Sequence, residues 1–147
     1  MQWMFFLLAL VAGMMMPTQA AINNKLATYV QSPVLAAFFS FAVGLVGLFL
    51  YMLVAKIPLN TLSNIKNAPP VSWLGGLCGA FFVTAVVISV PRLGIALTFS
   101  ILILGQMLIT LPIDHFGFLG IPVREINLPR LLGVILVIAG VFLIRRF

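Results

Sequence analysis

The chain has 147 residues, of which 63% are hydrophobic and only 7% are charged. A soluble domain carries about 25% charged residues, so this chain cannot cover a water-facing surface, and an integral membrane protein is the class that remains. The net charge of +6 does not indicate nucleic acid as a partner, because the eight basic residues stand singly or in pairs at the ends of apolar runs. There they are expected to anchor helix ends among lipid headgroups.

Residues 2–21 form the first apolar run and predict the first membrane span. A secretory signal peptide is the alternative, since residues 18–20 resemble a cleavage site, but no Lys or Arg precedes the apolar stretch as such a signal requires. We therefore expect the helix to continue toward Lys25. Gln19 and Asn23 are then four residues apart and share one face of this helix.

The next two apolar runs, residues 35–54 and 73–90, predict the second and third spans. Both carry small residues at intervals of four, a pattern typical of membrane helices that approach each other closely. Residues 56–70 separate the two runs, and their Asn, Ser, Thr and Pro content predicts a loop.

The fourth run, residues 94–113, contains an amide, Gln106, one helical turn before Thr110. Such an amide cannot be satisfied within its own helix, so Gln106 requires a neighbouring helix, water or a solute. Gln106 therefore has two interpretations of equal weight: it forms a contact between helices, or it is part of a binding site. For Ser and Thr side chains in these spans, a hydrogen bond to the preceding turn of their own helix is the simpler expectation.

The fourth run ends in the chain's only aspartate and only histidine, Asp114 and His115. A carboxylate at the C-terminus of a helix faces the negative end of the helix dipole, so Asp114 needs compensation. One interpretation is an ion pair at the membrane interface, with His115 or Arg124 as the partner. The other is a gate at the membrane edge that responds to protons or cations.

The fifth run, residues 128–144, is short but reaches across a bilayer if the arginines that flank it extend outward. The chain thus reads as a single transmembrane domain, residues 1–147, with five spans. No metal-ligand cluster and no pair of nucleophile and base is visible, and no cofactor is implied. The sequence therefore does not predict an enzyme, and no catalytic or metal-binding residues are assigned.

Five spans place the two chain termini on opposite sides of the membrane. Each side then receives four basic residues. One side has Lys56, Lys66, Arg124 and Arg130, and the other has Lys25, Arg92, Arg145 and Arg146. Since an excess of Lys and Arg in cytoplasmic loops sets the orientation, this balance favours insertion in both orientations, unless it arises by chance.

Glycines and polar residues recur in a characteristic order along the five runs. They are Gly13, Gln19, Asn23, Phe41, Gly44, Gly75, Gly76, Gly79, Pro91, Gly94, Gly105, Gln106, residues 114–117, Arg130, Gly133 and Gly140. This order resembles the short five-helix bacterial branch of the drug/metabolite transporter superfamily, the YdcZ-like branch. The resemblance runs nearly the full length, and the Gly-Gln and Asp-His-Phe-Gly segments are its most specific part.

The resemblance implies an all-α membrane protein whose five transmembrane helices form one half of an inverted-repeat transporter fold. Its partners would be a small solute, the lipid bilayer, and a second, oppositely oriented half in a homodimer or heterodimer. Candidates for lining the solute path are Gln19, Asn23, Gln106 and Thr110, and candidates for a gate or coupling site are Asp114 and His115. The small multidrug-resistance branch carries a glutamate in its first helix for cations and protons, and this chain has no acid there.

We therefore expect a multi-pass protein of the bacterial inner membrane that acts as a transporter subunit and works by alternating access, with dual topology as an antiparallel dimer. The alternative is a small membrane subunit that does not transport and instead assembles with, or regulates, a larger membrane complex. In that case the polar residues would serve only as contacts between helices.

Overall fold

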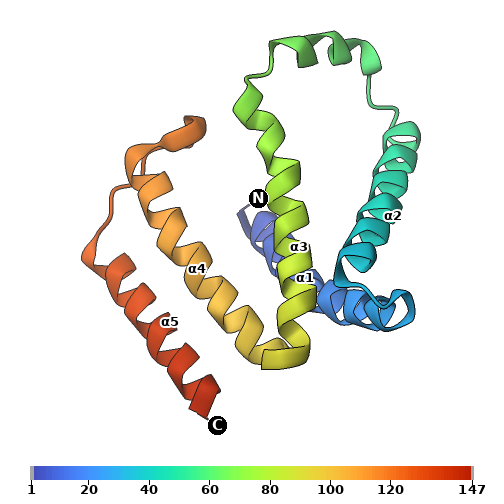
Figure 1. Cartoon of the computed structure of the whole chain (residues 1–147). Coiled ribbons are helices and arrows are strands. Elements are labelled where there is room, and N and C mark those ends of the chain that lie inside the picture. The colour runs from blue at the N-terminus through green and yellow to red at the C-terminus, as the bar shows by residue number, and fades with distance from the viewer. Residues whose placement is uncertain (1, 147) are drawn as a thin grey trace. The chain divides into compact units, whose positions relative to one another are not determined.

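The computed structural model describes residues 2–146, which fold into five α-helices joined by turns and three short 3₁₀ helices (Figure 1). The α-helices are α1 (Gln2–Val30), α2 (Pro33–Val54), α3 (Leu74–Leu93), α4 (Ile95–Phe116) and α5 (Leu128–Arg146). Each helix lies in a stretch that is long and apolar enough to cross a membrane. The described residues contain no β-strand. The predicted all-α membrane protein with five transmembrane helices is confirmed.

The first helix is longer than the predicted span at residues 2–21, because it continues to Val30. Its polar C-terminal part uses the helix backbone for its own hydrogen bonds. The Asn24 amide donates to the carbonyl of Ala20 at 3.0 Å, and the Thr28 hydroxyl donates to the carbonyl of Lys25 at 2.7 Å.

The chain forms two compact units, Met1–Pro91 and Arg92–Phe147. The prediction that residues 1–147 make up a single transmembrane domain stays a prediction. In the first unit α1 packs against α2, and the turn between them ends at Ser32, whose hydroxyl accepts a hydrogen bond from the Leu35 amide at 3.2 Å. Pro33 follows in the first turn of α2, where its missing N–H is not needed.

The core of the first unit is small and lies where α2 and α3 meet. Val87 is 1% exposed and packs with Val83 and Ala37, and side chains from α1 and α3 are partly buried against them. Farther along α3, a Cβ on Gly79 would lie 3.5 Å from the ring of Phe41 on α2. This is an ordinary van der Waals distance, so the position has room for a Cβ.

Residues 56–70, predicted as a loop from their polar composition, contain the 3₁₀ helix η1 (Leu59–Asn67), which is followed by η2 (Pro70–Trp73) (Figure 1). Within η1, Leu59, Leu62 and Ile65 recur every third residue. A 3₁₀ helix has three residues per turn, so these side chains form one apolar row. A short helix with an apolar row among polar residues is typical of a segment at a membrane surface.

The second unit is a hairpin in which α4 packs against α5 (Figure 1). Helix α4 is capped by Gly117, which has a left-handed backbone with φ of 63°. A Cβ at this position would lie 2.7 Å from Cγ2 of Val123. Glycine is therefore required twice here, for the backbone angle and for the space that Val123 fills. The short 3₁₀ helix η3 (Phe118–Gly120) follows in the segment that leads to α5.

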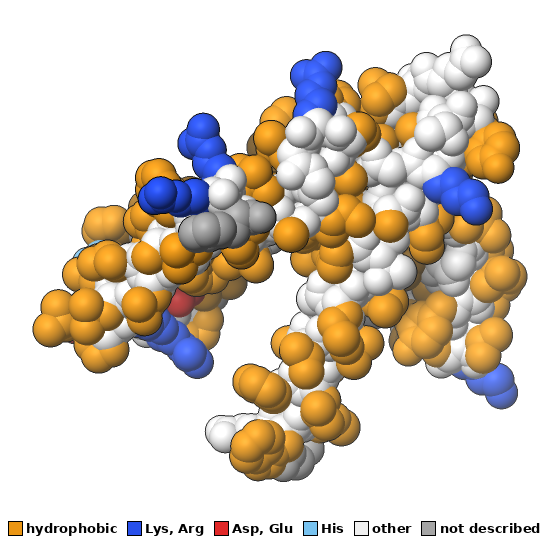
Figure 2. Space-filling model, turned by 90° about the horizontal axis from the view of Figure 1, so that it is seen from below, with side chains coloured by type: hydrophobic (Ala, Val, Ile, Leu, Met, Phe, Trp, Pro, Cys, Tyr) orange, Lys and Arg blue, Asp and Glu red, His pale blue; other side chains and the backbone are white. Residues whose placement is uncertain are grey.

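Apolar side chains dominate the outer surface of the helices. Figure 2 shows them spread over the face that it presents, with isolated Lys and Arg side chains among them. Many large side chains, such as Phe38 and Leu136, are more than 60% exposed. Contact with lipid rather than water accounts for this surface, because hydrocarbon tails solvate it without the cost of ordering water.

Candidate functional site

A groove of about 470 Å³ in the first unit collects polar side chains from α1 and α2. We call it the α1–α2 groove, and its lining residues are Met15, Met16, Thr18, Gln19, Ile22, Asn23 and Ser40. Gln19 and Asn23, predicted to share a face because they are four residues apart, both line it. Two of the four predicted solute-path residues therefore lie together in one groove.

Asn23 is the buried polar residue of this groove, with only 3% of its surface exposed. Its side-chain nitrogen has no hydrogen-bond partner among residues 2–146. The neighbouring amide of Asn24 satisfies its nitrogen with the carbonyl of Ala20, one turn back. Asn23 does not use that local solution. Since a buried amide donor without an acceptor costs about 1–3 kcal/mol, Asn23 requires an acceptor from outside the described fold.

The other polar groups of the groove differ from Asn23. The Thr18 hydroxyl donates to the carbonyl of Met14 at 2.9 Å, which is the local bond expected of Ser and Thr in helices. The side chains of Gln19, which is exposed, and Ser40, which is partly buried, make no hydrogen bond within residues 2–146. They remain available to a ligand that enters the groove.

A second groove, of about 400 Å³, lies between the two helices of the hairpin. We call it the α4–α5 groove, and its lining residues are Met107, Thr110, Leu111, Asp114, Arg130, Gly133, Val134 and Val137. Thr110 and Asp114 are predicted candidates that the structure brings together here, since they are four residues apart on α4. Gln106 precedes Thr110 by another four residues but does not line the groove.

Asp114 forms an ion pair with Arg130, and their Oδ2 and Nη1 atoms are 3.3 Å apart. Both side chains are largely covered, with 22% and 29% of their surfaces exposed. The same Nη1 atom donates to the carbonyl of Arg124 at 3.3 Å, and the Arg124 amide donates to the carbonyl of Asp114 at 2.8 Å. The structure thus shows Asp114 in an ion pair, and its part in a gate stays a prediction.

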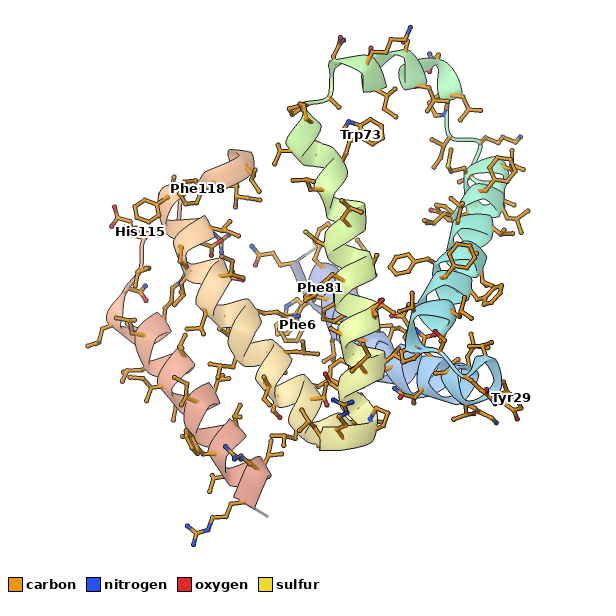
Figure 3. The ribbon with its side chains drawn as sticks, viewed as in Figure 1. Phe6, Tyr29, Trp73, Phe81, His115 and Phe118 are labelled. Atoms are coloured by element: carbon orange, nitrogen blue, oxygen red, sulfur yellow. The ribbon has the colours of Figure 1, made fainter. Side chains whose placement is uncertain are left out.

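The partner of Asp114 differs from the two residues expected from the sequence, His115 and Arg124. His115 instead accepts a hydrogen bond at Nδ1 from the Ile126 amide, at 3.3 Å. Figure 3 shows His115 at the end of α4, beside the segment that leads to α5. Arg124 contributes only backbone atoms to the Asp114 network.

Arg130 is the partner of Asp114 that the sequence analysis left out of the candidate set. A signal for it existed: Asp114 ends one helix and Arg130 begins the next, and consecutive antiparallel helices place such residues at the same membrane edge. In the structure, Asn127 helps to place Arg130, because its side chain accepts from the Arg130 amide at 3.0 Å at the start of α5.

Gln106 is exposed on α4, and its side chain makes no hydrogen bond within residues 2–146. The structure therefore supplies no helix partner for this amide, and its place in a solute path stays a prediction. Thr110 likewise makes no hydrogen bond to the described part of the chain. Across that same part, no three His, Cys, Asp or Glu side chains are grouped closely enough to hold a metal ion.

The chain is similar to a known protein family and to a bacterial inner-membrane protein. The model of a protein family described as "Putative inner membrane exporter, YdcZ" matches residues 4–143. The "Inner membrane protein YdcZ" of Escherichia coli (strain K12) is 35% identical over 71 residues, a match that covers 48% of this chain and 47% of that protein. In this match the chain spans about half the length of its relative. No solved structure matches the chain.

Proposed function

The chain belongs to the YdcZ exporter family, and on that premise we propose that it carries a small solute by alternating access, as one half of an antiparallel dimer. It is a multi-pass protein of the bacterial inner membrane, and its family is one of transporters rather than enzymes. The solute path is proposed to run through the α1–α2 groove, past Gln19 and Asn23.

The observation that carries this proposal is the buried amide of Asn23. Polar groups inside a membrane are expensive unless they have a partner, and those that remain without one mark solute paths or contacts between proteins. Asn23 lines the α1–α2 groove together with two further uncommitted polar side chains, Gln19 and Ser40. A solute that visits this groove supplies the missing hydrogen bond.

Pairing with a second copy is supported by the helix surfaces. Several glycines face open space, so that a Cβ added to any of them would meet nothing within 4 Å. They include Gly75, Gly105, Gly133 and Gly140. In membrane helices, small residues with open space permit close approach of another helix. An inverted second copy would also provide the opposite wall of a path that the α1–α2 groove leaves open.

In such a dimer the two copies of Asp114 lie at opposite faces of the membrane. Each Asp114–Arg130 pair joins the end of α4 to the start of α5. Opening and closing of this pair on one face at a time is the gate that we propose for alternating access. His115, which binds the connecting segment at Ile126, would move with it.

Efflux from liposomes that contain this protein alone tests the transport proposal. The liposomes are loaded with a mixture of small metabolites, and the solutes that leave are identified by mass spectrometry against protein-free liposomes. We expect at least one solute to leave, and Asn23→Leu to abolish its efflux. The matched variant Asn24→Leu should retain efflux, because Asn24 bonds to its own helix. If no solute leaves, the non-transporting subunit becomes the better account.

The antiparallel arrangement has its own test. Reporters fused after residue 147 should be active on both faces of the membrane. Two lysines added within residues 56–70 should drive that loop to the cytoplasm, and two added after residue 147 should give the opposite orientation. Each fixed variant should fail to transport alone, and the two together should recover transport. A single orientation of the unmodified chain would refute the homodimer and favour a partner of opposite orientation.

A further inference from the structure

The α1–α2 groove contains no charged side chain. This reflects the whole first unit, because Met1–Pro91 contains no aspartate or glutamate. Both acids of the chain belong to the other unit, and Asp114 is already paired with Arg130. The three lysines of the first unit, Lys25, Lys56 and Lys66, do not line the groove. A ligand there meets neutral groups only.

The polar atom that most requires a ligand is a donor. The side-chain nitrogen of Asn23 carries two N–H groups, it is buried, and no acceptor is within reach in the described fold. The thioether side chains of Met15 and Met16 and the side chain of Ile22 form the apolar part of the lining. The groove therefore combines one demanding donor with an apolar wall.

These features discriminate between solutes by charge. A cation brings a positive charge to a site that has no carboxylate to pair with it, and its donors do not satisfy the buried Asn23 nitrogen. An anion brings acceptors, but when the anion leaves water its charge finds no cationic side chain in the groove to pair with. Burying an unpaired charge costs far more than burying a neutral polar group that finds its hydrogen bond.

We propose that the α1–α2 groove binds an uncharged solute that presents a hydrogen-bond acceptor, such as a carbonyl oxygen, to Asn23 and rests a small apolar body on Met15, Met16 and Ile22. This deepens the proposed function, on which it rests, by naming the class of solute. Methionine side chains are flexible and polarisable, so the apolar body can vary in shape more than the acceptor can vary in position.

Three probes of nearly identical shape test the charge rule: benzamide, benzamidinium and benzoate. The first is neutral with a carbonyl acceptor, the second is a cation with donors only, and the third is an anion with acceptors only. Their saturable binding is measured by equilibrium dialysis against the protein in lipid nanodiscs, with binding to empty nanodiscs subtracted. We expect benzamide to bind at least about tenfold more tightly than either charged probe, the ratio that about 1.4 kcal/mol produces.

Two variants at one position sharpen the result. Asn23→Leu should weaken benzamide binding about tenfold, since it removes the donor, whereas the control Asn24→Leu should leave binding unchanged. Asn23→Asp keeps the shape but replaces the donor with a carboxylate. It should reverse the preference, so that benzamidinium binds most tightly of the three. Folding of each variant is checked by its elution as a single species.

The outcomes separate this proposal from the transport proposal. Equal or tighter binding of a charged probe to the unmodified protein overturns the charge rule, which is the proposal that the groove binds uncharged solutes. The absence of saturable benzamide binding overturns it too. Efflux of a charged metabolite that depends on Asn23 keeps transport and overturns the rule. Benzamide binding that depends on Asn23, without efflux of any solute, supports the rule and overturns transport.

Discussion

The α1–α2 groove holds a buried polar side chain without a partner, whereas the charged and polar side chains at the end of α4 bind the segment and the helix that follow. In the α1–α2 groove, Asn23 is buried without an acceptor and Gln19 makes no hydrogen bond to residues 2–146. In the hairpin, Asp114 binds Arg130 and His115 binds the Ile126 amide. Both sets were candidates for function on the same grounds, as rare polar residues in apolar surroundings.

The difference shows why polarity in a membrane helix does not by itself identify a site. A polar group that already has a hydrogen-bond or ion-pair partner within the fold contributes to the stability of the fold. Removing it should therefore lower stability. A buried group without a partner implies a ligand, and removing it should affect binding while leaving stability unchanged or improved. The following predictions test this division, and they run from the largest expected effect on stability to the smallest.

Gly117→Ala should damage the hairpin most. A left-handed backbone costs an L-residue about 1–2 kcal/mol, and the new Cβ would also lie 2.7 Å from Cγ2 of Val123. We expect a total loss of more than about 2 kcal/mol, measured as a lower midpoint of thermal unfolding in detergent. Gly120→Ala is the control, because Gly120 has φ of 81° but open space around it. Equal losses in the two variants would show that Val123 does not constrain position 117.

Asp114→Asn should lower stability by about 1–2 kcal/mol, because it removes the charge of the acceptor in a partly buried ion pair. The double variant Asp114→Arg with Arg130→Asp restores opposite charges in reverse order and should recover much of the loss. Unfolding midpoints of the three proteins measure this. If Asp114→Asn is as stable as the unmodified chain, the ion pair does not stabilise the hairpin.

His115→Ala should cost less, about 0.5–1 kcal/mol, because the Ile126 amide that loses its acceptor is exposed. His115→Gln, which keeps a side-chain acceptor, should lose less than His115→Ala. Hydrogen exchange at the Ile126 amide reports the contact directly and should accelerate in His115→Ala. Unchanged exchange at Ile126 would mean that this bond does not hold the connecting segment.

Gln106→Leu should leave the stability of the chain unchanged, since the side chain is exposed and makes no hydrogen bond to the described residues. We still expect efflux to be lost, because Gln106 continues the row of Thr110 and Asp114 on α4 and its amide requires a partner from solute or a second copy. Dimer formation, followed by cross-linking, is the control. Loss of the dimer would assign Gln106 to the contact between copies.

The five-helix architecture could be predicted from the sequence, because the signals for membrane helices are local in the chain. Apolar length and flanking charges predict all five helices, and the spacing of Gln19 and Asn23 correctly places them on one face, in one groove. The ends of the helices were less predictable. Helix α1 extends to Val30, beyond the expected Lys25, and hydropathy does not register where its polar part ends.

The pairing of side chains was harder to predict, because it depends on how helices meet. Asp114 was expected to use a neighbour, His115 or Arg124, but the fold brings Arg130 to it from the next helix. The contrast between Asn23 and Asn24 was likewise invisible in the sequence. These adjacent residues are chemically identical, and only the folded structure shows that one amide is buried while the other reaches its own backbone.

The most direct test of the account observes the Asn23 amide itself. The six asparagines of the chain are labelled with ¹⁵N at their side chains, and the resonances of Asn23 and Asn24 are assigned by substitution. Benzamide is then titrated into the protein in nanodiscs. We predict that the Asn23 amide resonance shifts and saturates as its donor finds an acceptor, while the Asn24 resonance stays in place. An Asn23 resonance that does not move at saturating benzamide would contradict the account.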